Sequence, residues 1–142
     1  MRRASRRLGQ IYDDAFTPCG LKATQYSLLS QIARSAEPKM RDLAQALVMD
    51  LSALGHTLKP LVRDGLVELQ TDETDRRSRR VLLTPAGQQK YLEARRISER
   101  VSRVFDDTFG AEETVKLRQA LDFIASEAFA QSLLEQLHSN EA

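Results

Sequence analysis

The fold is decided by residues 41–52, which read RDLAQALVMDLS. Apolar residues at helical spacing in the first half indicate a short helix through Leu43, Ala44 and Leu47. Asp50 then stands where the N-cap of a second helix is expected. This second helix carries apolar residues on one face and is expected to end at Gly65. Two helices joined by a turn of about four residues are typical of the helix-turn-helix motif.

A β-hairpin is predicted directly after the second helix. Residues 66–71 (LVELQT) and 81–83 (VLL) favour strands, and the connection between them has no apolar residue. Where the strands are expected to turn back, the connection carries the arginines Arg76, Arg77, Arg79 and Arg80. A helix-turn-helix followed by such a hairpin is a winged helix. The second helix suits the major groove of DNA, and guanidinium groups on a projecting loop suit a narrow minor groove.

Helices are predicted on both sides of this motif. A first helix is expected to stop near Pro18, and a second is expected to begin with Thr24 as its N-cap. After the hairpin, Thr84 is expected to cap a long charged helix to about Phe105. One last helix is predicted through residues 117–137. An apolar helix face left in water costs about 25 cal/mol per Å², so a two-fold dimer is the simplest way to cover these faces.

We therefore expect a mainly α protein, a winged helix-turn-helix with a wing of two to three strands and dimerisation helices at both ends. The expected organisation is one domain over residues 1–142. Its parts are a DNA-binding core at about 24–86, the wing at 66–84 within that core, and dimerisation helices at 1–18 and 86–142.

Composition excludes several other classes of protein. Hydrophobic residues make up 42% and charged residues 29% of the chain, as in an ordinary globular domain. No apolar run approaches the roughly 20 residues of a membrane span. No continuous apolar segment follows the basic start, so no signal peptide is expected. A single cysteine, Cys19, cannot form an internal disulfide, and we therefore expect a cytoplasmic protein. No catalytic set, phosphate loop or metal-ligand cluster stands out, so neither an enzyme nor a metal or other cofactor is expected.

The net charge of +1 hides an asymmetry along the chain. Residues 1–80 hold 14 Lys and Arg against 10 Asp and Glu, whereas residues 81–142 hold 7 against 10. The basic excess lies in the part that carries the helix-turn-helix and most of the hairpin. A charge run is often only a solvated surface, but beside these elements it favours contact with DNA phosphates.

These elements together resemble the MarR family of bacterial transcriptional regulators over nearly the whole chain. The most specific block is DRRSRRVLLTPAG at residues 75–87. Residues 43–67 resemble the family's helix-turn-helix, and residues 20–26 (GLKATQY) resemble the start of its second helix. The resemblance implies a homodimer that binds a palindromic operator in double-stranded DNA. It also implies that binding usually represses, and that a small aromatic or phenolic ligand often releases the protein.

The resemblance also gives individual residues their expected roles. Arg77 matches the arginine that enters the minor groove, and Asp75 matches the acid that steadies it through a charge-assisted hydrogen bond. Many members have arginine or asparagine on the base-reading face where this chain has Leu51, Gly55 and His56, so direct base reading is expected to be sparse. The predicted DNA-binding residues are Thr24, Gln25, Arg41, Ser52, Ala53, His56, Lys59, Asp75, Arg76, Arg77 and Arg79.

Thr24 has a second interpretation, because a plain N-cap explains it as well as a phosphate contact does. A ligand pocket is predicted to be lined by Tyr12, Phe16, Tyr26 and Leu29, although apolar residues at this spacing are also typical of a core.

Two alternative functions stay open. A redox-responsive regulator would act through Cys19, but no adjacent Lys, Arg or His marks a reactive thiolate, so an inert residue is expected. A winged-helix adaptor would bind a protein in place of DNA, and the arginine-rich wing argues against it.

Overall fold

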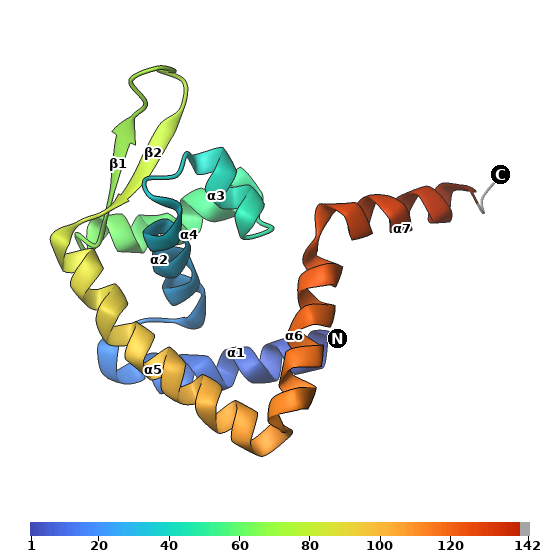
Figure 1. Ribbon diagram of the computed structural model, residues 1–142. Helices are drawn as coiled ribbons and strands as arrows, with labels where there is room; N and C mark the ends of the chain where they lie inside the picture. The colour runs from blue at the N-terminus through green and yellow to red at the C-terminus, as the bar shows by residue number, and fades with distance from the viewer. Residues whose placement is uncertain (140–142) are drawn as a thin grey trace. The chain divides into compact units, whose positions relative to one another are not determined.

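The computed structural model describes residues 1–139 (Figure 1). Its elements in chain order are α1 (Arg2–Phe16), the short 3-10 helix η1 (Thr17–Cys19), α2 (Ala23–Ser35), α3 (Met40–Ala46), α4 (Leu51–Arg63), β1 (Val67–Thr71), β2 (Arg79–Leu83), α5 (Pro85–Phe109), α6 (Ala111–Ala125) and α7 (Glu127–Ser139). The chain forms two compact units, Met1–Val101 and the part from Ser102 onward. No helix among residues 1–139 is long and apolar enough to cross a membrane.

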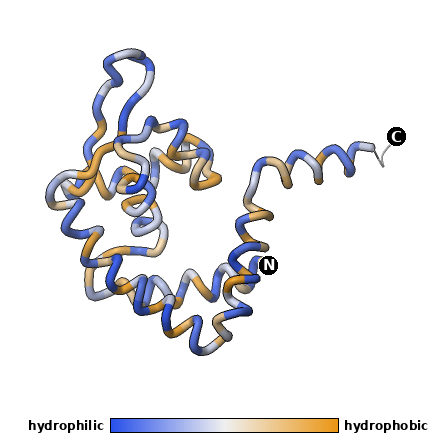
Figure 2. The backbone as a smooth tube through the Cα atoms, in the orientation of Figure 1, coloured by the Kyte–Doolittle hydropathy of each residue, from blue (hydrophilic) through white to orange (hydrophobic). Residues whose placement is uncertain are grey.

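The core of the first unit is centred on α2, α3, α4 and the hairpin, and α1, η1 and α5 each add a buried side chain to it. Along these helices, apolar residues (orange) are interspersed with polar ones (blue), which gives each helix one side suited to burial (Figure 2). In α4 the buried side chains are Leu54, Leu58 and Leu61, whose spacing puts them on one face. The other fully or nearly fully buried apolar side chains of this unit are Phe16, Cys19, Leu21, Leu28, Leu29, Ile32, Leu43, Ala44, Val67, Val81 and Ala94.

The helix-turn-helix forms as the sequence predicts. The side chain of Asp50 accepts a hydrogen bond from the main-chain N–H of Ala53 at 2.7 Å, which caps α4. Pro60 lies inside α4 without ending it. Gly65 takes a left-handed φ of +72° directly after the helix, so the chain turns into β1 at a position that favours glycine.

The wing is a two-stranded antiparallel sheet that projects from the first unit (Figure 1). Its register pairs Val67 with Leu83 and Thr71 with Arg79. The prediction that Arg79 and Arg80 lie in the turn is wrong, because β2 begins at Arg79. The backbone explains the longer strand: both arginines pair with β1, and Arg80 also forms an isolated bridge with Lys39.

The predicted cap of α2 is also wrong. The helix begins at Ala23, so Thr24 lies inside its first turn and Lys22 is the N-cap residue. The carboxylate of Asp13, in α1, accepts a hydrogen bond from the main-chain N–H of Ala23 at 2.7 Å. The side chain of Gln25 accepts one from the main-chain N–H of Lys22 at 2.8 Å. Two side chains outside position 24 therefore satisfy the start of this helix.

Thr84 caps α5 as expected, since its hydroxyl accepts a hydrogen bond from the main-chain N–H of Gly87 at 3.0 Å. Gly87 is required by packing, because a Cβ there would overlap the carbonyl oxygen of Leu66. The helix continues to Phe109, four residues beyond the predicted end.

The single last helix predicted over 117–137 is two helices, α6 and α7, which separate at Ser126. The Ser126 hydroxyl donates to the carbonyl of Phe123 at 2.7 Å and accepts from the main-chain N–H of Phe129 at 3.2 Å. This side chain therefore ends one helix and caps the next.

The second unit leaves many apolar side chains exposed. Its internal contacts include a buried Thr114, whose hydroxyl donates to the carbonyl of Gly110, and an ion pair between Arg118 and Asp106 at 3.1 Å. The large apolar side chains that remain exposed in this unit are Val104, Phe109, Val115, Leu121, Phe123, Ile124, Leu133, Leu134 and Leu137.

Candidate DNA-binding surface

An open groove runs along α4, between this helix and the hairpin. Five of the predicted DNA-binding residues line this groove. Four belong to α4 and the fifth to β2: Ser52, Ala53, His56, Lys59 and Arg79. Leu51 and Gly55 line the same groove. The buried leucines of α4 fix which face of the helix turns toward the core, so the opposite face, with Ser52, His56 and Lys59, is exposed.

Gly55 is not explained by packing within the chain. A Cβ at this position would meet no other atom within 4 Å. A glycine inside a helix lowers stability by about 1 kcal/mol relative to alanine. Gly55 therefore lowers the stability of α4, and its missing side chain leaves the wall of the groove shallower at this position.

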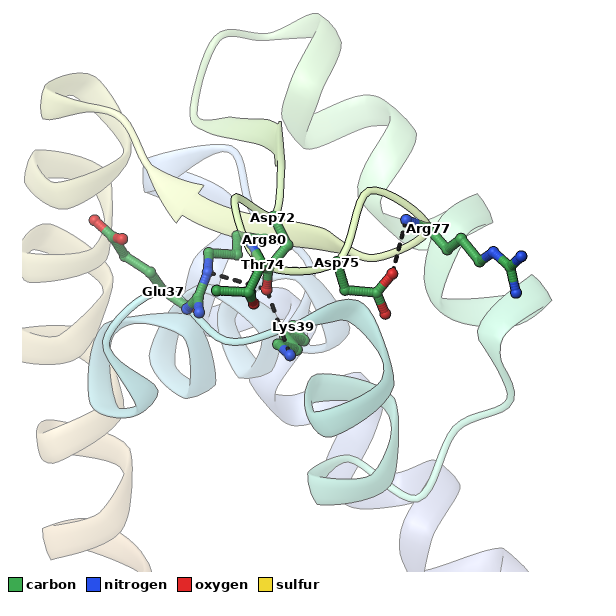
Figure 3. Close-up of polar contacts among 7 residues, drawn as sticks. All are labelled: Glu37, Lys39, Asp72, Thr74, Asp75, Arg77 and Arg80. Atoms are coloured by element: carbon green, nitrogen blue, oxygen red, sulfur yellow. Dashed lines mark hydrogen bonds and ion pairs between the residues drawn. The ribbon is translucent and has the colours of Figure 1, made fainter.

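A second hollow adjoins the first, between the start of α3 and the loop of the wing. Its lining includes three of the predicted residues outside α4, Arg41, Asp75 and Arg77, together with Arg79. The Asp75 carboxylate accepts a hydrogen bond from the main-chain N–H of Arg77 at 3.0 Å, and the arginine side chain extends away from that carboxylate (Figure 3). Asp75 therefore steadies the backbone of the loop, where we expected a bond to the guanidinium group.

Three predicted residues do not join these two hollows. Thr24 and Gln25 lie in the first turn of α2, and the side chain of Gln25 already accepts the Lys22 N–H. Arg76 is exposed in the wing loop and lines neither hollow. The groove and the adjoining hollow thus bring together Arg41, Ser52, Ala53, His56, Lys59, Asp75, Arg77 and Arg79.

Sequence reasoning missed the charged cluster at the base of the wing loop. Asp72 is 1% exposed, and its carboxylate lies 3.4 Å from both Lys39 and Arg80 (Figure 3). Hydrogen bonds from the main chain and hydroxyl of Thr74, with the charges of Arg80 and Lys39, hold the pKa of Asp72 well below its usual range. No pattern in the sequence separates Asp72 from its polar neighbours in the loop.

Comparison with known proteins places this geometry in a family. A model described as the MarR family matches residues 20–78. The solved structure of the transcriptional regulator MosR of M. tuberculosis in complex with DNA is 32% identical, with a TM-score of 0.70. The match covers 85% of this chain and 92% of MosR. The chain belongs to the MarR family. The predicted family and the winged-helix fold class are confirmed, and the protein is a DNA-binding transcriptional regulator, not an enzyme.

Two further solved structures support the fold. The transcriptional repressor CouR bound to a 23-mer DNA duplex is 22% identical, with a TM-score of 0.81, and the match covers 88% of this chain and 89% of that one. CouR from Rhodococcus jostii RHA1 bound to p-coumaroyl-CoA is 20% identical, with a TM-score of 0.77, over 89% and 88% of the two chains. No curated protein matches the chain.

Three of the four predicted ligand residues of this MarR-family chain, Tyr12, Phe16 and Tyr26, form an aromatic cluster. The Phe16 ring stands 4.8 Å from the Tyr26 ring and 6.0 Å from the Tyr12 ring, measured between centroids. Tyr91 of α5, which the sequence did not single out, stacks on Tyr26 at 6.3 Å. Phe16 and Leu29 are fully buried, so only the half-buried tyrosines offer a ligand any surface.

Cys19 lies in the core of the first unit. Its side chain is 4% exposed, and the thiol donates a hydrogen bond to the Phe16 carbonyl at 3.2 Å. A buried thiol with a main-chain partner is poorly accessible to an oxidant. This environment favours the inert interpretation over a redox switch.

Proposed function

We propose that this chain is a homodimeric repressor that binds a palindromic operator and is released from it by a small aromatic or phenolic ligand. The observation that carries the DNA-binding part is the groove beside α4, which Ser52, His56 and Lys59 line together with Arg79 of the wing. In this proposal α4 enters the major groove, and the side chain of Arg77 enters the adjacent minor groove. Residues 24–86 act as the DNA-binding core, and residues 1–18 and 86–142 as dimerisation helices.

Arg77 is the residue on which the minor-groove contact depends. It lies in a loop whose backbone is fixed by Asp75, and its side chain points away from that acid (Figure 3). A guanidinium group so presented is attracted by the negative potential of a narrow A·T-rich minor groove. The wing therefore reads groove width, whereas His56 and Ser52 read bases in the half-site centre.

Dimerisation is supported by the exposed apolar side chains of the second unit. Leu121 is 51% exposed and Ile124 is 44% exposed in the single chain. Exposed apolar surface of this kind marks an interaction site. A two-fold dimer would place its two copies of α4 on half-sites about one helical turn apart, roughly 10 base pairs between centres.

Selection of DNA from a random pool tests the operator proposal. The protein should enrich a palindrome, and footprinting should protect two half-sites about one turn apart. Binding to the enriched duplex should weaken steeply as salt is raised, because phosphate contacts release counterions. If the protein enriches no sequence and binds all duplexes alike, the proposed function is wrong.

The effector proposal rests on three half-buried tyrosines: the rings of Tyr12 and Tyr26 pack against Phe16, and Tyr91 stacks on Tyr26. CouR, whose structure this chain resembles, binds the aromatic thioester p-coumaroyl-CoA. Calorimetry with p-coumarate and 4-hydroxybenzoate, with and without the enriched duplex, tests the proposal. By linkage, a compound that weakens DNA binding must itself bind the DNA complex more weakly by the same factor. Equal affinity in both states excludes that compound.

A further inference from the structure

The buried carboxylate of Asp72 connects the wing to the helix-turn-helix. One oxygen, Oδ1, accepts hydrogen bonds from the main-chain N–H and the hydroxyl of Thr74, both at 2.8 Å. The other, Oδ2, lies 3.4 Å from Lys39 Nζ and 3.4 Å from Arg80 Nε (Figure 3). Asp72 thus stands between a strand of the wing and the residue that directly precedes α3.

The segment on the other side of this cluster has an unusual backbone. Ala36 and Glu37 both take positive φ values, 49° and 59°, which residues other than glycine, asparagine and aspartate rarely adopt. Arg80 holds this segment by donating from Nη1 to the carbonyl of Glu37 at 3.0 Å. The main-chain N–H of Val81 donates to the carbonyl of Pro38 at 2.9 Å.

We propose that Asp72, Lys39 and Arg80 form a positioning cluster that sets the wing relative to α3 and α4, and so determines how well the protein discriminates its operator. This inference rests on the proposed function. Arg77 lies only five residues after Asp72, and α3 begins one residue after Lys39. A shift at the cluster therefore moves the minor-groove contact relative to the major-groove contact, and both must fit one DNA duplex.

The direction in which one substitution changes the affinity for DNA separates a positioning role from a purely electrostatic one. Asp72→Asn keeps an oxygen to accept the Thr74 hydrogen bonds and removes the negative charge that faces Lys39 and Arg80. If charge alone mattered, losing a carboxylate near DNA would tighten binding. If Asp72 positions the wing, the same change weakens binding to the operator although the protein becomes more basic.

The matched control is Glu73→Gln. Glu73 is the exposed neighbour of Asp72, and its substitution removes the same charge at nearly the same place. The probe is the duplex that the parent protein enriches from a random pool, with a scrambled duplex of the same composition beside it. Both affinities are measured by fluorescence anisotropy over a range of salt concentrations.

We expect Asp72→Asn to bind the enriched duplex at least about threefold more weakly than the parent. Its binding to the scrambled duplex should be unchanged or tighter. Glu73→Gln should bind both duplexes as well as the parent or more tightly. If Asp72→Asn binds the enriched duplex as tightly as Glu73→Gln, the cluster does not position the wing.

A second pair of variants decides the matter even if Asp72→Asn fails to fold, as circular dichroism would reveal. Arg79 lines the groove, whereas Arg80 bonds to Glu37 and Asp72. Arg80→Gln should lower affinity for the enriched duplex and leave the salt slope unchanged. Arg79→Gln should reduce that slope by about one phosphate contact. An Arg80→Gln variant that lowers the slope as Arg79→Gln does would make Arg80 a DNA contact and overturn the proposal.

The proposed function and the positioning role of Asp72 are contradicted by different results. A parent protein that binds the scrambled duplex as tightly as any enriched one contradicts the proposed function, and the positioning role falls with it. A parent that discriminates, together with an Asp72→Asn variant that discriminates equally well, contradicts the positioning role alone.

Discussion

The carboxylate of Asp75 accepts a hydrogen bond from the main-chain N–H of Arg77 at 3.0 Å, and the Arg77 side chain extends away from it (Figure 3). An acid two residues before an arginine would be expected to form an ion pair with it, but here it forms a turn in the backbone. The turn presents the guanidinium group at the end of the wing, where DNA can be reached.

Asp75→Ala should therefore weaken operator binding, because the loop loses the bond that fixes its backbone. Asp75→Asn should bind nearly as well as the parent, since the amide oxygen can accept the same hydrogen bond. Titration of the enriched duplex with both variants measures this. Tighter binding by Asp75→Ala than by the parent would mean that the acid acts only through its charge.

Gly55→Ala should stabilise the protein and weaken its DNA binding. Alanine gains up to about 1 kcal/mol in a helix interior, and the added methyl meets nothing within the chain but stands in the groove beside α4. Gly9→Ala is the matched control, because its methyl also meets nothing and it lies in α1, away from this groove. Thermal denaturation and DNA titration are compared for both. If the two variants affect operator binding equally, α4 does not closely approach DNA at Gly55.

Leu121→Glu combined with Ile124→Glu should produce monomers. Both side chains are exposed in the single chain, and we propose that a second copy covers them. Light scattering should give twice the 16.0 kDa chain mass for the parent and about one chain mass for the variant. Operator affinity should fall by more than roughly tenfold, since two half-sites are no longer linked.

The control for dimerisation is Gln119→Glu combined with Gln131→Glu, which adds the same charge at exposed polar positions of α6 and α7. This control should stay dimeric. A leucine–isoleucine variant that also stays dimeric would place the interface elsewhere.

The lowered pKa of Asp72 predicts how the free energy of unfolding depends on pH. Its pKa in the folded protein is lowered from the ordinary value of 3.8, chiefly by the hydrogen bonds from Thr74 and further by Arg80 and Lys39. The carboxylate therefore adds to the free energy of unfolding above about pH 4, and this contribution is lost as the pH falls below the unfolded-state pKa. Denaturation between pH 6 and pH 3 should show the stability of the parent approaching that of Asp72→Asn as acid is added. A constant difference over this range would contradict the assignment.

The sequence predicts those parts of the fold that depend on local chemistry. Asp50, Gly65 and Thr84 act on residues within a few positions of themselves, so a cap or a turn could be recognised from the residue type alone. The break at Ser126 is also local, but a serine between two apolar patterns is equally compatible with one continuous helix. Its two hydrogen bonds, to Phe123 and Phe129, decide the break.

Features that depend on distant partners could not be predicted. The start of α2 is satisfied by Asp13 from another helix, so Thr24 is not needed as a cap. The same holds for the site. The residues that line the groove from α4 follow from the spacing of its buried leucines, whereas Asp72 owes its burial to Lys39 and to the fold that brings them together. Because Lys39 is far from Asp72 in the sequence, no local sequence pattern reveals this cluster.

The wing and α4 are proposed to read different parts of one operator, and the variant Arg77→Ala separates the two contributions. The measurement is the affinity of the parent and of Arg77→Ala for the enriched duplex, once with A·T-rich flanks and once with G·C-rich flanks around the same half-site centres. The account predicts a loss of about 1–3 kcal/mol on the A·T-rich duplex and a much smaller loss on the other, with half-site preference retained. If Arg77→Ala binds both duplexes as the parent does, the wing is only a solvated loop and the account is wrong.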